Sequence, residues 1–290
     1  MKQSKALVGF AVCFGTSCAA MLIAIGCAQV QSGLEKLSPS HAAQVSQAQS
    51  QAQPYVDPGK KLVRSVTVAG DKDAIGQSIA LAATNRYGLL DDDRLQAYVT
   101  LVGLSVVNSS SDPNGHYVFG VLDSDLPTAC SGPNGYIMIT RGALMMMDDE
   151  SELAGVLAHE IAHVQANDGI HAIEQSLRLQ AGSEVAGTLD ARFAQFNSMT
   201  DQAVVQILDK GYSRDQEIRA DLTAIQLLHA AGYDAGGYVR FLKKLQTKSQ
   251  SRADLFATHP GMSERVARLN PPNAPGGQTL QARFREYVLH

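Results

Sequence analysis

Residues 152–164 read Glu-Leu-Ala-Gly-Val-Leu-Ala-His-Glu-Ile-Ala-His-Val, and they are the most informative part of the sequence. Its large apolar residues recur at helical spacing and form one stripe that can face a core. They are Leu153, Val156, Leu157, Ile161 and Val164. Acidic residues at 148–150 suit the positive end of a helix. The pattern predicts a helix over residues 150–166, with one face buried.

The same helix carries a pair of histidines with metal-binding spacing. His159 and His163 are four residues apart, so both imidazoles can reach one ion from one helix face. Glu160 is rotated by about 100° around the helix, which lets it reach a water without binding the metal. We expect one Zn²⁺ per chain, with Glu160 as the general base. The alternative is a chance match on a helix that contains two histidines.

A later helix is the expected source of the third ligand. The metzincin pattern fails, because Ala166 and Gly169 stand where its glycine and third histidine would fall. Two histidines and one glutamate are the other common ligand set. Residues 214–231 predict a helix, with Ser213 as its N-cap and Gly232 as its stop signal.

Two acids on this predicted helix are candidates for the site. Glu217 and Asp221 are four residues apart on one face, where two free carboxylates would repel each other mildly. The pairing is understandable if Glu217 binds zinc and Asp221 contacts a ligand histidine from behind. The alternative is two solvated acids on an exposed face.

The remaining pattern indicates an α+β fold. A small sheet follows two helices and precedes a long helical part. Strands are predicted over 116–122 and 136–140, and further helices over 74–87, 92–107, parts of 170–210, 236–247 and 262–269. The segment 170–210 either covers the cleft as a lid or packs as ordinary helices. The apolar residues near the C-terminus, Leu280, Phe284, Tyr287 and Val288, dock on the domain or on a partner.

The N-terminus has the features of an export signal. Lysines at 2 and 5 precede an uncharged, mostly apolar run that ends at Cys27. Residues 24–27, Ala-Ile-Gly-Cys, resemble a bacterial lipobox and predict lipidation of Cys27. Alternatives are a weaker lipobox ending at Cys18 and an uncleaved membrane anchor. We expect a signal over 1–27, a flexible tether over 28–60 and a zinc metalloprotease domain over 61–290. The body would then lie in the cell envelope, on the periplasmic side of the outer or inner membrane.

Composition narrows the possible partners. The 290 residues carry a formal net charge of −4, so nucleic acid is not an expected partner. Of the four cysteines, Cys13, Cys18 and Cys27 lie in the predicted signal. Only Cys130 remains, and the mature domain can therefore form no internal disulfide. The oligomeric state stays open.

Several motifs together resemble a known family. They are residues 117–125, residues 135–144, residues 152–164, Glu217 with Ala220-Asp221, and Thr258-His259-Pro260 with Glu264-Arg265. Between Tyr98 and Leu269 the chain resembles the HtpX-like and prenyl-protease-like gluzincins. These are zinc metalloproteases found in membranes and as periplasmic lipoproteins. The resemblance implies a mainly helical, zincin-like domain with a small sheet beside the active-site helix.

The resemblance also implies roles for individual residues. Glu217 would be the third zinc ligand, with Asp221 behind a ligand histidine. His259 would lie near the metal, as a transition-state stabiliser or as a switchable ligand. Strand 136–140 would be the edge strand that pairs with an extended substrate. Residues 128–135 depart from the family pattern, and Cys130 is either a thiol near the cleft or a small buried residue.

The expected function is that of a zinc-dependent endopeptidase. Misfolded or unassembled cell-envelope proteins are the substrates that the resemblance implies, reached from a lipid anchor in the membrane. Two alternatives remain open: a non-proteolytic chaperone or envelope assembly factor, and a zinc hydrolase of peptidoglycan peptides or other small substrates.

Overall fold

The computed structural model describes residues 72–180, 204, 207–208, 211–249, 259, 262–269 and 277–289. The predicted signal with Cys27, the predicted tether and most of residues 181–210 lie outside this part of the chain. Among the described residues, no helix is both long and apolar enough to cross a membrane.

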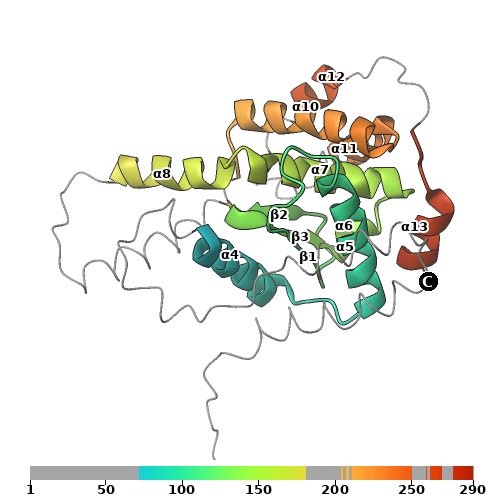
Figure 1. Ribbon diagram of the computed structural model, residues 1–290, viewed down its shortest axis with the longest axis horizontal. Coiled ribbons are helices and arrows are strands. Elements are labelled where there is room, and N and C mark those ends of the chain that lie inside the picture. The colour runs from blue at the N-terminus through green and yellow to red at the C-terminus, as the bar shows by residue number, and fades with distance from the viewer. Residues whose placement is uncertain are drawn as a thin grey trace, which may run out of the picture.

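The fold is mainly helical, with one small sheet, and confirms the predicted α+β class (Figure 1). Before the central helix come α4 (Lys72–Tyr87), α5 (Asp93–Val107), β1 (Val118–Leu122), β2 (Ala129–Gly132), the 3₁₀ turn η1 (Pro133–Gly135), β3 (Tyr136–Thr140) and α6 (Arg141–Leu144). The central helix and those after it are α7 (Glu150–Gln165), α8 (Asp168–Gln180), α10 (Arg214–Ala231), α11 (Ala235–Ser249), α12 (Met262–Arg268) and α13 (Gln281–Val288).

The sheet corrects one expectation. Its strand order is β1-β3-β2, with β1 parallel and β2 antiparallel to β3. Strand 136–140 is therefore the central strand, and the prediction that it forms the edge was wrong. Every residue of β3 is buried, because α7 covers one face of the sheet and α4 covers the other. The edge beside α7 is β2, which sequence reasoning missed.

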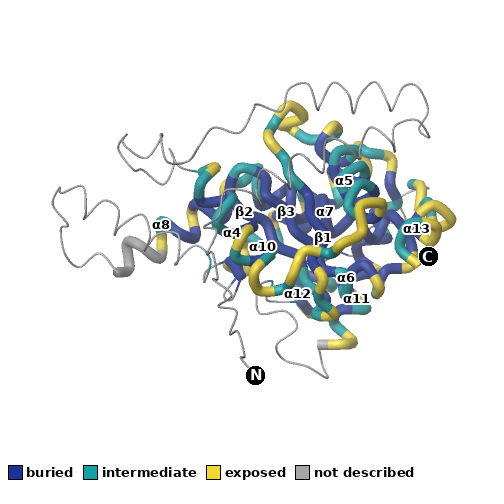
Figure 2. Tube along the Cα trace, turned by 90° about the horizontal axis from the view of Figure 1, so that it is seen from below, coloured by how far each residue is buried: buried dark blue, intermediate teal, exposed yellow. Residues whose placement is uncertain are grey.

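Helix α7 lies at the centre of the layers (Figure 1). Helix α10 packs along one side of α7, the sheet lies on the opposite side, and α4 covers the far face of the sheet. Residues 150–163 of α7 are all buried, which makes this helix a continuous dark tube in Figure 2. The predicted stripe faces a core, and neighbouring elements cover the rest of the helix as well.

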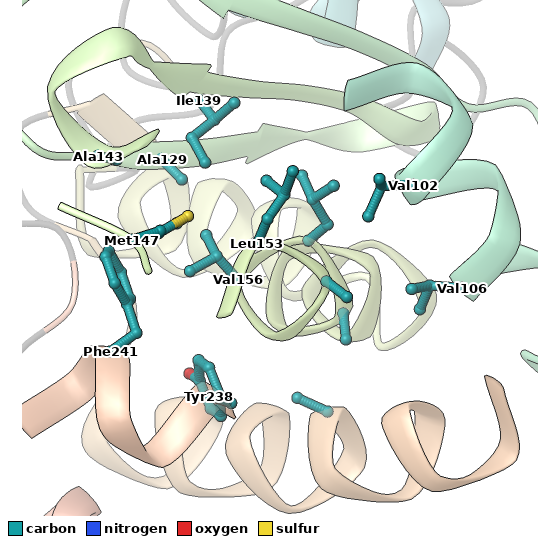
Figure 3. Close-up of a cluster of buried hydrophobic side chains, with 14 of the residues drawn as sticks. Val102, Val106, Ala129, Ile139, Ala143, Met147, Leu153, Val156, Tyr238 and Phe241 are labelled. Atoms are coloured by element: carbon teal, nitrogen blue, oxygen red, sulfur yellow. The ribbon is translucent and has the colours of Figure 1, made fainter. Parts of the chain in front are cut away.

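A close helix crossing fixes α11 on α7. A Cβ added at Gly155 would lie 2.5 Å from Tyr238 Cβ, and one added at Gly237 would lie 2.1 Å from Ser151 Oγ. Glycine is needed at both positions because the two backbones approach so closely. The main hydrophobic core joins this crossing to α5 and the sheet, and Figure 3 shows part of it.

Helix α10 begins and ends at the residues that the sequence predicted. The Ser213 side chain accepts a hydrogen bond from Gln216 N, and the Gln216 side chain accepts one from Ser213 N. The two bonds form a capping box. Gly232 ends the helix at φ 80°, in the left-handed region. These two signals set where α10 begins and ends, and so the position of Glu217 on it.

The last helix docks on the domain. Phe284 of α13 is fully buried in the main core, and the Tyr287 ring stacks on Tyr98 of α5 at 4.6 Å. In the segment 170–210, Ile173, Ile207 and Leu208 are buried in a second core cluster beside α4. These three residues contribute to packing, and the rest of the predicted lid lies mostly outside the described residues.

Candidate metal centre

Four potential metal ligands meet between α7 and α10. His159 and His163 come from α7, Glu217 comes from the first turn of α10, and His259 follows α11 in the chain. One ligand atom of each lies within 4.8 Å of those of the other three. The structure thus brings together all three predicted zinc ligands and places the predicted His259 with them.

The spacing of these atoms suits a tetrahedral ion. His159 Nε2 lies 3.0 Å from His163 Nε2, 3.5 Å from Glu217 Oε2 and 3.4 Å from His259 Nδ1. His163 Nε2 lies 3.4 Å from Glu217 Oε1. Ligands at about 2.0–2.1 Å from a tetrahedral zinc would lie about 3.3 Å from one another. The nitrogen and oxygen donors therefore fit Zn²⁺ in both type and separation.

Carboxylates contact the far nitrogens of both α7 histidines. His159 Nδ1 lies 3.0 Å from Asp221 Oδ1, an ion-pair contact without the alignment of a hydrogen bond. His163 Nδ1 lies 2.8 Å from Asp168 Oδ2, within hydrogen-bond distance. Such partners turn the opposite ring nitrogen toward a metal. The structure places Asp221 as predicted and adds Asp168.

Asp168 was missed because nothing in its local sequence marks it. Asn167, at φ 54°, turns the chain between α7 and α8 and brings Asp168 back beside His163. Gln216 and Arg219 of α10 both donate hydrogen bonds to Asp168 Oδ1. A carboxylate five residues after the second histidine is a usable signal only when this turn is known.

One arginine holds the acids of α10. Arg265 is 2 % exposed, and its guanidinium binds both oxygens of Asp221 at 2.7 Å. Its Nη1 lies 2.7 Å from Glu217 Oε2. The planar guanidinium donates along two edges, so one side chain can fix both carboxylates. The sequence resemblance included Arg265 but gave it no role.

The electrostatics of the cluster favour a cation. Burial alone would raise the pKa of Glu217, but the imidazoles of His259, His159 and His163 hold that pKa well below its usual range. Burial would lower the pKa of His163, but hydrogen bonds to Asp168 and Glu217 raise it to about 9. The carboxylates thus create a negative potential strong enough to hold a proton on a buried imidazole.

Glu160 lies at the edge of the ligand group. It is 1 % exposed, and its Oε1 lies 3.4 Å from His259 Nε2. Its Oε2 is buried and has no hydrogen-bond partner among the described residues. An unpartnered carboxylate oxygen beside a metal site is available to take a proton.

Cys130 lies on β2, an edge strand of the sheet. The thiol is buried, and burial raises its pKa, so the reactive thiolate is disfavoured. The structure gives Cys130 the features of the small buried residue, which was one of its two interpretations.

Known proteins resemble this chain over most of the described region. A family model described as "Peptidase family M48" matches residues 93–273. A "Putative beta-barrel assembly-enhancing protease" of Vibrio cholerae is 26% identical over 242 residues, covering 77% of this chain and 50% of that protein. "Metalloprotease YcaL" of Escherichia coli is 26% identical, covering 58% of this chain and 66% of its own length. A "Protease HtpX homolog" of Bacillus subtilis is 29% identical, covering 49% and 57%. The chain spans about half the length of the first of these relatives.

Proposed function

Because the chain belongs to peptidase family M48, we propose that it is a zinc-dependent endopeptidase of misfolded or unassembled cell-envelope proteins. The observation that carries the proposal is the ligand group with Glu160 beside it, whose Oε2 has no hydrogen-bond partner among the described residues. A relative named as a β-barrel assembly-enhancing protease supports an envelope substrate. His159, His163 and Glu217 are the residues that would hold the zinc ion.

The proton transfers fall to Glu160. Zinc, when bound, supplies a Lewis acid that acidifies water and polarises the scissile carbonyl. Glu160 Oε2 has no hydrogen-bond partner among the residues that the structure describes, so it can take the proton of the attacking water. The same carboxyl then returns the proton to the leaving amine. Glu160 is 1% exposed, so bulk solvent has little access to the base.

His259 is proposed as the switchable fourth ligand. Its Nδ1 lies 3.0 Å from Glu217 Oε1 and 3.4 Å from His159 Nε2, close to the separation that a fourth tetrahedral donor would have. A catalytic zinc site needs this position open for substrate. The histidine is the most exposed of the four, since its side chain is 13% accessible. Of the four side chains, that of His259 can therefore move away from the metal position most easily.

The edge of the sheet offers backbone groups to a peptide. His259 Nε2 lies 3.4 Å from Ala129 O, and Tyr212 Oη donates a hydrogen bond to Ser131 O at 3.2 Å. These contacts identify the side of β2 that faces the metal centre. We propose that an extended substrate pairs with β2, the role that the sequence assigned to strand 136–140.

The proposed localisation follows from the N-terminal sequence. Residues 1–27 would be the lipoprotein signal with Cys27 lipidated, 28–60 the tether and 61–290 the protease domain. The relative from Vibrio cholerae, named for β-barrel assembly, supports the cell envelope as the site of action.

The test is zinc content and casein cleavage by the purified protein, with Glu160→Gln beside the wild type. We expect one zinc per chain in both, and a loss of cleavage of about 10²–10⁴-fold in the variant. Unchanged cleavage in Glu160→Gln would refute the base. A second variant, His259→Ala, should keep zinc and cleave faster than the wild type.

Two further assays, of aggregation and of cleavage of short cell-wall peptides, separate the two alternative functions. Zinc without cleavage of any protein, but with suppression of aggregation, would indicate a chaperone or assembly factor. Cleavage of short cell-wall peptides but not of casein would indicate a hydrolase of small substrates. Absence of zinc would refute the ligand assignment.

A further inference from the structure

The free edge of β2 offers two backbone carbonyls to a partner strand. Just before β2, Thr128 O accepts a hydrogen bond from Thr140 N at 3.0 Å. In an antiparallel pair, every second residue points its N–H and C=O at the neighbouring strand. Cys130 therefore faces β3, whereas Ala129 and Ser131 direct their backbone groups away from it. Ala129 O and Ser131 O are thus the acceptors at the free edge.

A side chain of the protein contacts each of these two carbonyls. His259 Nε2 lies 3.4 Å from Ala129 O, and Tyr212 Oη donates a hydrogen bond to Ser131 O at 3.2 Å. The side chain of His259 is 13% accessible, and its proposed role as a switchable ligand requires it to move. The carbonyl of Ala129 becomes free when His259 leaves, whereas that of Ser131 keeps its bond to Tyr212.

Tyr212 is held in place from two directions. Its side chain is buried, and its ring stacks on the ring of His163 at 4.2 Å. The next residue, Ser213, is the N-cap of α10, the helix that carries Glu217. A movement of Tyr212 would therefore disturb one proposed zinc ligand directly and a second one through the start of its helix. We infer that Tyr212 stays where it is when a substrate binds.

The ring of Tyr212 also occupies the space that a substrate strand would need. Paired strands lie about 4.8 Å apart. Because Tyr212 Oη lies 3.2 Å from Ser131 O, the ring behind this oxygen lies in the path of a strand paired with Ser131. Ser131 itself is buried under this cover. A peptide on the edge of β2 can thus reach Ala129 but not Ser131.

We propose that Tyr212 ends the substrate-binding edge of β2, so that the peptide pairs with Ala129 and turns away before Ser131. This inference rests on the proposed endopeptidase function and on the proposed pairing with β2. Tyr212 is then a specificity-determining residue, because it limits how much of the substrate must be extended on this side of the metal centre. A loop of a partly folded protein can supply such a short extended stretch.

The test is a scan of peptide binding by fluorescence anisotropy. The zinc-loaded Glu160→Gln protein, which binds without cutting, is the parent and is compared with the same protein carrying Tyr212→Ala. Each backbone amide of one extended peptide is N-methylated in turn, which removes its N–H donor. Tyr212→Ala opens the edge, so it should gain one sensitive amide, two residues from an amide that is sensitive in both proteins. Methylation at the gained position should weaken binding about 2–10-fold.

Two further substitutions separate the ring of Tyr212 from its hydroxyl. Tyr212→Phe keeps the ring in the path of the strand and should gain no sensitive amide. A gained amide in Tyr212→Phe would mean that the peptide takes the place of the hydroxyl on Ser131 O, which would overturn the proposal. Tyr212→Leu keeps an apolar side chain against His163 but is too short to reach Ser131 O. It should gain the same amide as Tyr212→Ala, and it replaces that variant if the alanine form loses zinc.

Tyr98→Ala is the matched control, because Tyr98 has similar surroundings far from β2. Its side chain is buried, its ring stacks on Tyr287 at 4.6 Å, and its hydroxyl donates a hydrogen bond to Glu150 at 2.9 Å. Its methylation pattern should equal that of the parent. The proposal is wrong if Tyr212→Ala and Tyr212→Leu have the pattern of the parent, or if Tyr98→Ala gains the same amide.

Casein cleavage decides the proposed function separately. Cleavage that requires Glu160, without a gained amide in Tyr212→Ala, overturns the role of Tyr212 and leaves the endopeptidase standing. A gained amide in a protein that cuts no casein supports the limit at Tyr212 and refutes the endopeptidase.

Discussion

Helix α7 carries two buried groups of charged residues, and their charge balances differ. The first, at the helix start, is the N-terminal cluster. It consists of Asp149, Glu150 and Glu152 with the cations Arg240, Lys244 and Arg283. The second is the metal cluster around His159 and His163. Its carboxylates are Glu160, Asp168, Glu217 and Asp221, and its cations are Arg219 and Arg265.

The N-terminal cluster is complete within the protein. Glu150 is fully buried and binds Arg283, and it also accepts hydrogen bonds from Tyr98 and Tyr233 at 2.9 and 2.8 Å. Lys244 donates to both oxygens of Glu152. Among the described residues, three buried carboxylates thus meet three cations. Arg240 and Lys244 also pair with Asp234 and Asp148, whose carboxylates reach solvent, so water screens these two charges. A buried charge that is paired and hydrogen-bonded in this way contributes to the fold and needs no ligand.

The metal cluster is incomplete within the protein. Its four carboxylates meet two guanidinium groups among the described residues, so two negative charges remain when the histidines are neutral. A divalent cation would balance them. The comparison teaches that burial of charged groups does not by itself identify a binding site. The imbalance, together with the unpartnered Glu160 Oε2, does.

The variant with the largest expected effect removes Arg265, the buried cation of the metal cluster. Arg265→Met leaves Glu217 and Asp221 buried without their guanidinium, which should lower the free energy of unfolding of the metal-free protein by about 3–5 kcal/mol. Zinc should recover part of the loss, because it supplies positive charge at the same place. The measurement is urea unfolding with and without zinc. A loss that zinc does not reduce would contradict the charge argument.

The matching change in the N-terminal cluster should have a smaller effect. Arg283→Met leaves Glu150 with two tyrosine hydroxyls, and the arginine it removes is already 46% exposed. We expect a loss of about 2 kcal/mol in the free energy of unfolding, below the value for a fully buried pair. Urea unfolding should give the same loss with and without zinc, and the zinc affinity should equal that of the wild type. Rescue by zinc here would remove the distinction between the clusters.

Sequence reasoning recovered the elements with strong local signals. The helix over 214–231 and the strand over 136–140 were predicted with the bounds that the structure has. Strand β2 was missed because Ala-Cys-Ser-Gly lacks β-branched and aromatic residues and does not alternate. The family resemblance assigned the edge to strand 136–140, and β2 lies beyond that strand in the sheet. Strand order is a tertiary property, and one strand's pattern does not contain it.

The residues of the site also fall into two groups: those that the sequence revealed and those that only the structure shows. His159, Glu160 and His163 follow from spacing on one helix, and Glu217 with Asp221 from a second pair at helical spacing. The carboxylate of Asp168 and the guanidinium of Arg265 reach the site only through a turn and a helix packed against α10 and α11. The local sequence of Asp168 carries no signal, and the motif that contains Arg265 gives no role to its side chain. Only the fold places them beside the ligands.

The smallest expected effect concerns the carboxylate that the sequence did not reveal. Asp168→Asn keeps the shape of the side chain but removes the charge that His163 Nδ1 contacts at 2.8 Å. A less basic ligand should bind zinc about 10–100-fold more weakly, measured by competition with a fluorescent chelator. Asp215→Asn, at an exposed position of α10, is the matched control and should leave the affinity unchanged. If both variants bind zinc as the wild type does, Asp168 only joins α8 to α10 through Arg219, and this ion pair does not belong to the metal cluster.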